Sequence, residues 1–79
     1  MNLAEDREQI DAVDASVWKA VDPFIYKNEP NEALRWLRVM TELTQARSWA
    51  LVKCRYRVLH HDAPDSFQPD HYHAWRNVE

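Results

Sequence analysis

Glycine is absent from all 79 residues of this chain. Gly supplies the positive-φ positions of tight hairpins, phosphate-cradling loops and nucleophile turns, because it carries no Cβ. A P-loop, a glycine-rich dinucleotide fingerprint and a G-x-S-x-G nucleophile elbow are therefore excluded. The nucleotide and acyl-transfer chemistry that depends on these motifs is excluded with them.

Cysteine is almost absent, since Cys54 is the one thiol in the sequence. The chain can therefore form no internal disulfide and no zinc knuckle built from thiolates. Cys54 has Val52 and Tyr56 as near neighbours, and we interpret it as a small buried apolar residue. The start of the chain, MNLAEDREQ, is acidic where a signal peptide needs a positive start, and no apolar run reaches the length of a membrane span. We expect a cytoplasmic protein without a membrane partner.

The composition is that of a folded protein, with 46% hydrophobic residues and four tryptophans. Residues 1–79 are long enough for one small domain, near the lower limit at which a chain folds alone. Small helical chains of this size commonly complete their core with a second copy or with a partner protein. We therefore expect association, either as a homodimer or with a larger protein.

Charge divides the sequence into three blocks. Residues 1–33 carry eight acidic and three basic side chains, whereas residues 34–61 carry six basic side chains and one acidic one. Residues 62–79 are acidic again, with four acidic side chains and one basic one. This asymmetry predicts surfaces of opposite charge on one small molecule.

Residues 31–61 form the stretch around which we expect the chain to fold. They contain no Gly, Pro or Asp, and good helix formers make up most of the stretch. We predict one long basic helix, or two helices that meet near residues 44–48. Apolar residues from Val52 to Val58 also alternate with basic ones, which is a strand pattern. We favour helix, because no other segment offers a partner strand.

The flanking segments complete an all-α prediction: a small helical hairpin or bundle with one long central helix, kinked or split, and a short C-terminal element. Residues 1–22 form an acidic helix, expected from Leu3 to Val21, which the Asp22–Pro23 pair should end. Residues 23–30 connect it to the long helix. Residues 62–79 form a tail rich in His and aromatics, in which we expect Phe67, Tyr72 and Trp75 to dock on the long helix.

Residues 7–14, REQIDAVD, resemble the R-x-x-I-D-x-[IV]-D opening of the helical chorismate mutases. The resemblance covers the first helix alone, and the further Arg, Lys, Glu and Gln positions of that family have no counterparts here that we can place. Any acidic amphipathic helix produces a similar pattern, so we do not assign the chain to the family.

Four histidines gather near the C-terminus among three aspartates. The seven residues are His60, His61, His71, His73, Asp62, Asp65 and Asp70. Imidazole and carboxylate groups together bind zinc and other divalent ions. Ligands that share a helix face lie three or four residues apart, however, and neither pair of neighbouring histidines does so. Metal binding is thus our third hypothesis, and we predict no cofactor, no catalytic residue and no enzymatic activity.

The basic segment carries most of the functional information, because arginines alternate there with Trp and Tyr. Such residues dominate binding energy at protein interfaces, and they also contact phosphates and stack on bases. The residues that we predict to bind a partner are Arg35, Trp36, Arg38, Arg47, Trp49, Lys53, Arg55, Tyr56, Arg57 and Trp75. A purely structural explanation also exists, in which the acidic first helix packs along the basic one and neutralises it.

Our first functional hypothesis is a non-enzymatic interaction protein that binds a larger protein and modulates or inhibits it. Small accessory proteins of this kind are encoded by phages, plasmids and other mobile elements. The second hypothesis is a small dimeric nucleic-acid-binding protein that uses the same basic, aromatic segment. It ranks lower because the flanking blocks are acidic and no helix-turn-helix spacing is present.

Overall fold

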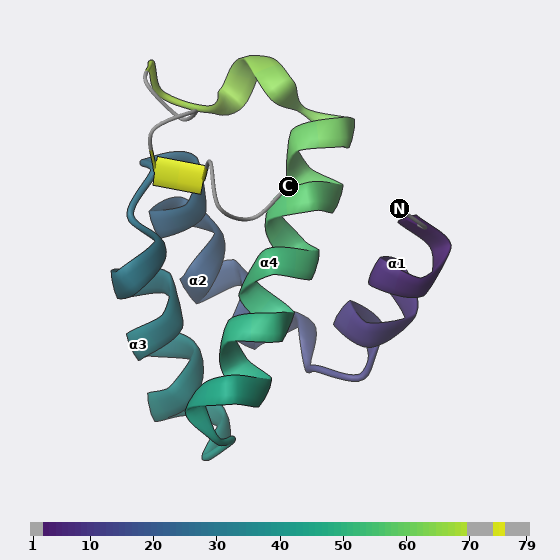
Figure 1. The fold of residues 1–79 in the computed structure, drawn as a ribbon, viewed down its shortest axis with the longest axis vertical. Coiled ribbons are helices and arrows are strands. Elements are labelled where there is room, and N and C mark those ends of the chain that lie inside the picture. The colour runs from purple at the N-terminus through teal and green to yellow at the C-terminus, as the bar shows by residue number, and fades with distance from the viewer. Residues whose placement is uncertain (1–2, 70–73, 76–79) are drawn as a thin grey trace.

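The computed structural model describes residues 3–69 and 74–75 of the chain. Four α-helices follow one another: α1 (Leu3–Asp11), α2 (Ala15–Tyr26), α3 (Pro30–Thr41) and α4 (Gln45–Asp62), and a short 3₁₀ turn at Pro64–Ser66 follows them (Figure 1). Within these described residues there is no strand, and residues 48–59 lie inside α4. The all-α prediction is confirmed, and helix is the correct choice for the ambiguous second half of the basic segment.

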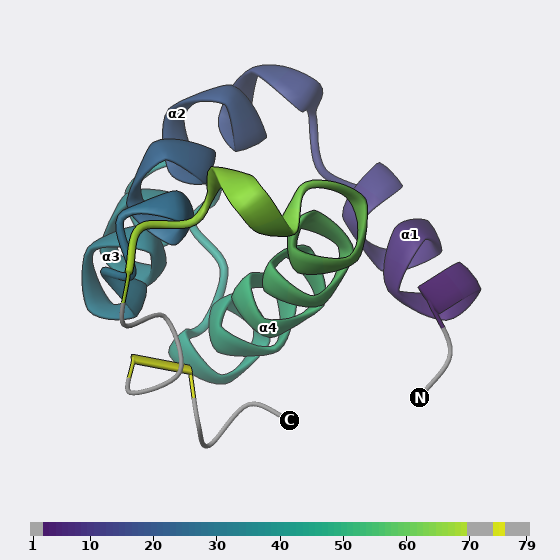
Figure 2. The same cartoon turned by 90° about the horizontal axis from the view of Figure 1, so that it is seen from above.

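α4 is the central helix of the molecule. It lies between α3 and α1 in both views, and α2 packs on α3 (Figures 1 and 2). Every helix contributes to one apolar core, represented by Ile10 of α1, Val21 and Ile25 of α2, Leu37 of α3 and Leu51 of α4. α4 is covered on two sides, so it buries residues around much of its circumference and has no single apolar stripe.

The prediction of one continuous helix over Leu3–Val21 is wrong, because the helix is interrupted between α1 and α2. Asp14 caps α2: its Oδ1 accepts hydrogen bonds from the backbone N–H of Ser16 at 2.8 Å and from the Ser16 hydroxyl at 2.7 Å. These bonds lower the pKa of the Asp14 carboxyl below its ordinary value. The indole N–H of Trp18 donates to the carbonyl of Ile10 at 3.0 Å and ties α2 to the end of α1. A capping aspartate and a tertiary contact thus outweigh the continuous apolar periodicity.

The predicted helix end at Asp22–Pro23 is also wrong, since Pro23 lies inside α2. Proline in a helix interior removes a backbone donor and crowds the preceding turn. Val21 and Ile25, one on each side of it, are both fully buried. Burial of this face favours continuation of the helix. α2 ends instead before Lys27, and the next residue, Asn28, has a positive φ of 61°.

The basic segment consists of two helices rather than one, as the split alternative predicted. The break covers residues 42–44, slightly before the expected position. Glu42 adopts the left-handed region at φ 60°, and its N–H donates to the carbonyl of Arg38. The Thr44 hydroxyl then accepts from the backbone N–H of Arg47 at 3.2 Å and caps α4.

The C-terminal aromatics dock on α4, as expected for Phe67 and Trp75. The Trp75 ring stacks on Tyr56 with 4.4 Å between ring centroids, and Phe67 meets Tyr56 edge-on at 5.6 Å. Asn28 fixes the backbone directly after Phe67, because its side-chain amide donates to the carbonyls of Gln68 at 2.9 Å and Pro69 at 3.2 Å. Tyr72, the third predicted contact, lies outside the described residues.

Candidate functional site

Two of the predicted partner-binding residues belong to the core. Tyr56 is 2% exposed and Trp75 is 1% exposed. Their rings stack on one another, and Tyr56 also stacks on His60 at 5.6 Å. Both side chains therefore stabilise the fold and cannot reach a partner, so we remove them from the predicted binding face.

Arg55 is engaged within the molecule. Its Nε and Nη2 donate to the two carboxylate oxygens of Asp22 at 2.9 and 2.7 Å, which joins α4 to α2. The guanidinium also lies 5.5 Å from the ring centre of Trp18. A paired geometry of this kind holds the side chain firmly and leaves little of its charge for a ligand.

Arg57 makes the equivalent contact on the other side of α4. Its Nε and Nη2 donate to the carboxylate of Asp6 at 2.8 and 2.9 Å, which joins α4 to α1. This hydrogen bonding lowers the pKa of the Asp6 carboxyl, whereas burial raises the pKa of the nearby Cys54 thiol. The acidic first block therefore neutralises two arginines of the basic segment. We remove Arg55 and Arg57 from the predicted binding face.

Arg47 lies at the exposed beginning of α4 and donates a hydrogen bond to the side-chain carbonyl of Gln9 on α1. Five predicted residues then remain that are neither in the core nor engaged in these contacts. They are Arg35, Trp36, Arg38, Trp49 and Lys53.

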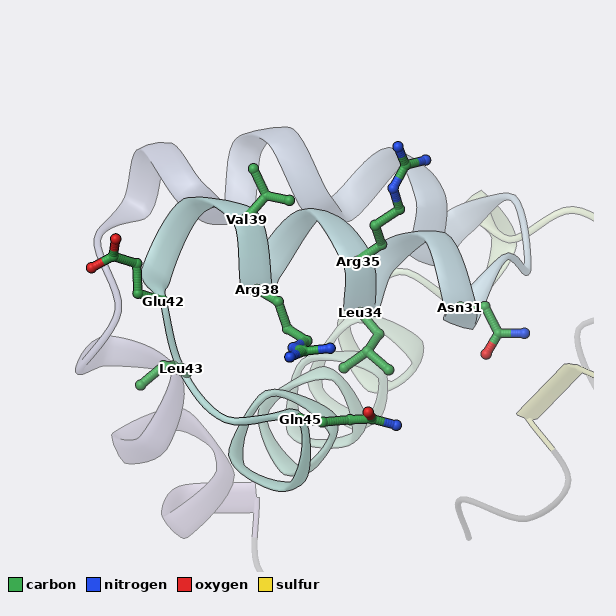
Figure 3. A pocket seen from close by; sticks show the side chains of 8 residues that line it. All are labelled: Asn31, Leu34, Arg35, Arg38, Val39, Glu42, Leu43 and Gln45. Atoms are coloured by element: carbon green, nitrogen blue, oxygen red, sulfur yellow. The ribbon is translucent and has the colours of Figure 1, made fainter.

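Arg35, Arg38 and Trp49 line a groove between α3 and the first turns of α4, which we call the α3–α4 groove, and Lys53 lies beside Trp49. It consists of two adjoining hollows of about 490 Å³ each that share Asn31, Leu34 and Gln45. One hollow extends along α3 past Arg38, and the other reaches Trp49. Figure 3 shows Leu34 and Arg38 pointing from α3 toward Gln45, while Arg35 and Val39 lie along the other edge of the helix.

The groove has an apolar floor and a basic rim. Leu34 and Trp49 are both partly buried, and each leaves part of its surface open to the groove. Lys53 lies one turn after Trp49, with its ammonium 6.0 Å from the indole ring centre. Among the described lining residues, Glu42 is the one acid, at the far end of α3. Apolar contact and positive charge are thus available together.

A second exposed feature on α3 escaped the sequence prediction. Trp36, Val39 and Met40 are 40%, 67% and 42% exposed, and of the three the sequence predicted Trp36 alone as a partner-binding residue. Trp36 stacks on Phe24 of α2 at 6.2 Å, which places it on the side of α3 away from α4. The available signal was the position of Val39, which shares a helix face with Arg35 and Glu42 at spacings of four and three residues.

A third hollow, of about 600 Å³, lies by the α1–α2 connection and is lined in part by Trp18, Asp22 and Arg55. Asp22 and Arg55 are paired with one another there, whereas Asp11 and Lys19, which also line this hollow, make no ion pair with a described residue.

The histidine cluster lies only partly within the described residues. His60 stacks on Tyr56 and meets Phe67 edge-on, and Nδ1 of His61 lies 3.1 Å from the carboxylate of Asp62. Hydrogen bonds from Arg7, and then from His61, lower the pKa of Asp62 to about 2. Over residues 3–69 and 74–75, no group of three potential ligands could hold a metal ion. His71, His73 and Asp70 lie outside the described residues.

The helices of the described chain are too short or too polar to cross a bilayer. Comparison with protein-family models, with curated proteins and with solved structures finds no match to this chain. The functional argument therefore depends on the α3–α4 groove and its surroundings.

Proposed function

We propose that this protein is a non-enzymatic interaction module that binds a larger protein through the α3–α4 groove and modulates it. One observation carries the proposal: an apolar floor of Leu34 and Trp49 lies open beside Arg38 and Lys53, for which the described chain has no acidic partner. Trp and Arg are the residue types most enriched among those that dominate protein interfaces.

The charge of the groove indicates the chemistry of the partner segment. A large apolar side chain fits between Leu34 and Trp49, and carboxylates on either side of it would meet Arg38 and Lys53. Most of the affinity should come from the desolvated apolar contact, whereas the charges should set orientation and association rate. The expected ligand is a short acidic segment that carries an aromatic or aliphatic anchor.

Nucleic acid fits this surface less well. Arg55 and Arg57, two of the six basic residues of the central segment, are occupied by Asp22 and Asp6. Nucleic-acid affinity depends strongly on the number of phosphates that cations neutralise, so each engaged arginine weakens that alternative.

Peptide display against the immobilised protein tests the proposal. We expect selection of peptides that combine Asp or Glu with Trp, Phe or Leu. In titration calorimetry the Trp49→Ala variant should bind them at least about tenfold more weakly, the loss expected when an interface anchor is truncated. Trp36→Ala is the matched control, because that indole lies on the other side of α3, and its affinity should be unchanged.

Two results would reject the proposal. One is selection of peptides whose affinity Trp49→Ala leaves intact. The other is tight binding of a labelled 20-nucleotide DNA or RNA that falls steeply from 50 to 300 mM salt and depends on Arg38 rather than Trp49. That second result would favour the nucleic-acid hypothesis.

A further inference from the structure

The most exposed apolar surface of the described chain is the stripe formed by Trp36, Val39 and Met40 on α3, which we call the α3 stripe. Val39 and Met40 follow Trp36 at spacings of three and four residues, so the three side chains share one face of the helix. The stripe adjoins the α3–α4 groove, because Val39 also lines one edge of it, whereas Leu34 and Arg38 point from α3 in a different direction, toward Gln45 (Figure 3).

Two opposite charges border the stripe in a self-complementary arrangement. Arg35 and Glu42 are seven positions apart with Val39 between them: Arg35 and Val39 lie along one edge of α3, and Glu42 lies just past the end of the helix (Figure 3). A two-fold axis that crosses α3 beside Val39 brings Arg35 of each copy to Glu42 of the other. A parallel pairing would instead place each charge against its own kind.

Neither charge is firmly engaged within one molecule. Arg35 lies 3.6 Å from Glu32, but 70% of the Arg35 side chain is exposed, and solvated pairs of this kind contribute little. Glu42 makes no ion pair with any described residue. Its position past the end of α3 is defined by the left-handed backbone and by the hydrogen bond from its N–H to Arg38.

We propose that a second copy of this chain covers the α3 stripe, with the two α3 helices antiparallel and Arg35 of each copy paired with Glu42 of the other. Val39 meets its own counterpart at the axis, and Trp36 and Met40 extend the apolar contact along one side. Such an isologous contact is the commonest form of self-association. A single pair of twelve-residue helices is a small interface, so we expect dissociation in the micromolar range, about 1–100 µM.

Charge exchange tests this arrangement directly by sedimentation equilibrium from 1 µM to 1 mM at 150 mM salt. Arg35→Glu gives a copy with acids at both positions, and Glu42→Arg gives a copy with bases at both. Each variant alone should dimerise at least about tenfold more weakly than the unmodified chain. An equimolar mixture of the two should recover dimers, because every cross-contact is then attractive. The double variant Arg35→Glu/Glu42→Arg should dimerise alone.

Circular dichroism verifies that each variant is folded, and Trp49→Ala serves as a control that should leave the dimer intact. The proposal is overturned if the unmodified chain is monomeric at 1 mM, which would leave the stripe for another protein. It is equally overturned if dimers form but neither single variant weakens them. A monomeric chain that still binds peptides through Trp49 would reject the dimer proposal alone. A dimer that binds no such peptide would reject the groove proposal alone.

Discussion

Ser48 is one of three described residues with a buried side-chain polar atom that has no hydrogen-bond partner; the other two are Asn28 and Trp75. The Ser48 side chain is fully buried in the first turn of α4, and its hydroxyl makes no hydrogen bond with a described group. A buried hydroxyl without a partner loses its bonds to water and gains none in return. The most economical explanation for a small residue here is close approach of the surrounding helices.

Removing this hydroxyl should therefore stabilise the protein. We expect Ser48→Ala to raise the free energy of unfolding by about 1 kcal/mol, measured by urea denaturation. Ser66→Ala, at an exposed position, is the control and should change it little. A loss of stability in Ser48→Ala would mean that the hydroxyl is satisfied, for instance by a buried water.

Local rules and tertiary packing compete at individual residues, and this competition sets the limit of sequence-based prediction. The composition of residues 31–61 was enough to predict helix, and Phe67 and Trp75 were recognised as docking residues. The sequence predicts a continuous helix through Asp14, where the helix is in fact interrupted, and a helix end at Pro23, where the helix in fact continues. Asp14 interrupts a periodic pattern by capping, whereas Pro23 fails to interrupt one because Val21 and Ile25 are buried around it.

The candidate site could be predicted only in part, for a reason that appears at the scale of whole helices. Arg55 and Arg57 are two residues apart, so their side chains point away from α4 in nearly opposite directions. One reaches Asp22 of α2 and the other reaches Asp6 of α1. The sequence contains all four residues but does not show that both sides of α4 are covered. Arg38 and Trp49 remain available because no acidic helix lies over the groove.

The C-terminal segment is an element held by aromatic packing. Trp75 is 1% exposed and stacks on Tyr56, so its removal should leave a cavity against α4. We expect Trp75→Ala to lower the free energy of unfolding by about 3 kcal/mol, in the range measured for buried Trp or Phe truncations. Trp36→Ala is the matched control in the same denaturation experiment. Because Trp36 is 40% exposed, its loss should cost clearly less.

An equal cost for the two tryptophans would contradict this description of the C-terminal segment. It would mean that the buried Trp75 ring contributes no more to the free energy of unfolding than the exposed Trp36 ring does. Phe67→Ala would then separate the contribution of the other ring that packs on Tyr56.

The whole molecule is organised by opposite charges that meet across α4. α1 buries only Asp6 and Ile10, and two ion pairs join it to α4: Arg57 with Asp6, and Arg7 with Asp62 at 2.8 Å. Few apolar contacts hold a helix of nine residues, so the carboxylates have an unusually large share in fixing it. Attachment of α1 should therefore depend on pH.

The direction of this dependence follows from the two carboxyl groups. Arg57 lowers the pKa of Asp6 in the folded protein below its ordinary value of 3.8, and Arg7 lowers that of Asp62 to about 2. A depressed pKa means that the folded state binds the proton less readily than the unfolded chain. The resulting stabilisation is complete above about pH 5 and is lost as the pH falls from about 4 toward 2.

We therefore expect the free energy of unfolding of the unmodified chain to be nearly constant from pH 7 to 5 and to fall below pH 4, as measured by urea denaturation at each pH. Asp6→Asn removes the titrating group and leaves Arg57 without its charged partner. It should cost about 1–3 kcal/mol at pH 7 and flatten the acid limb of the profile, because its penalty is already present at neutral pH. Asp65→Asn, at an exposed position on the 3₁₀ turn, provides the matched control and should follow the unmodified profile. If Asp6→Asn and the unmodified chain lost stability in parallel below pH 4, the acid-sensitive part of the link between α1 and α4 would have to rest on Arg7 and Asp62 rather than on Arg57 and Asp6.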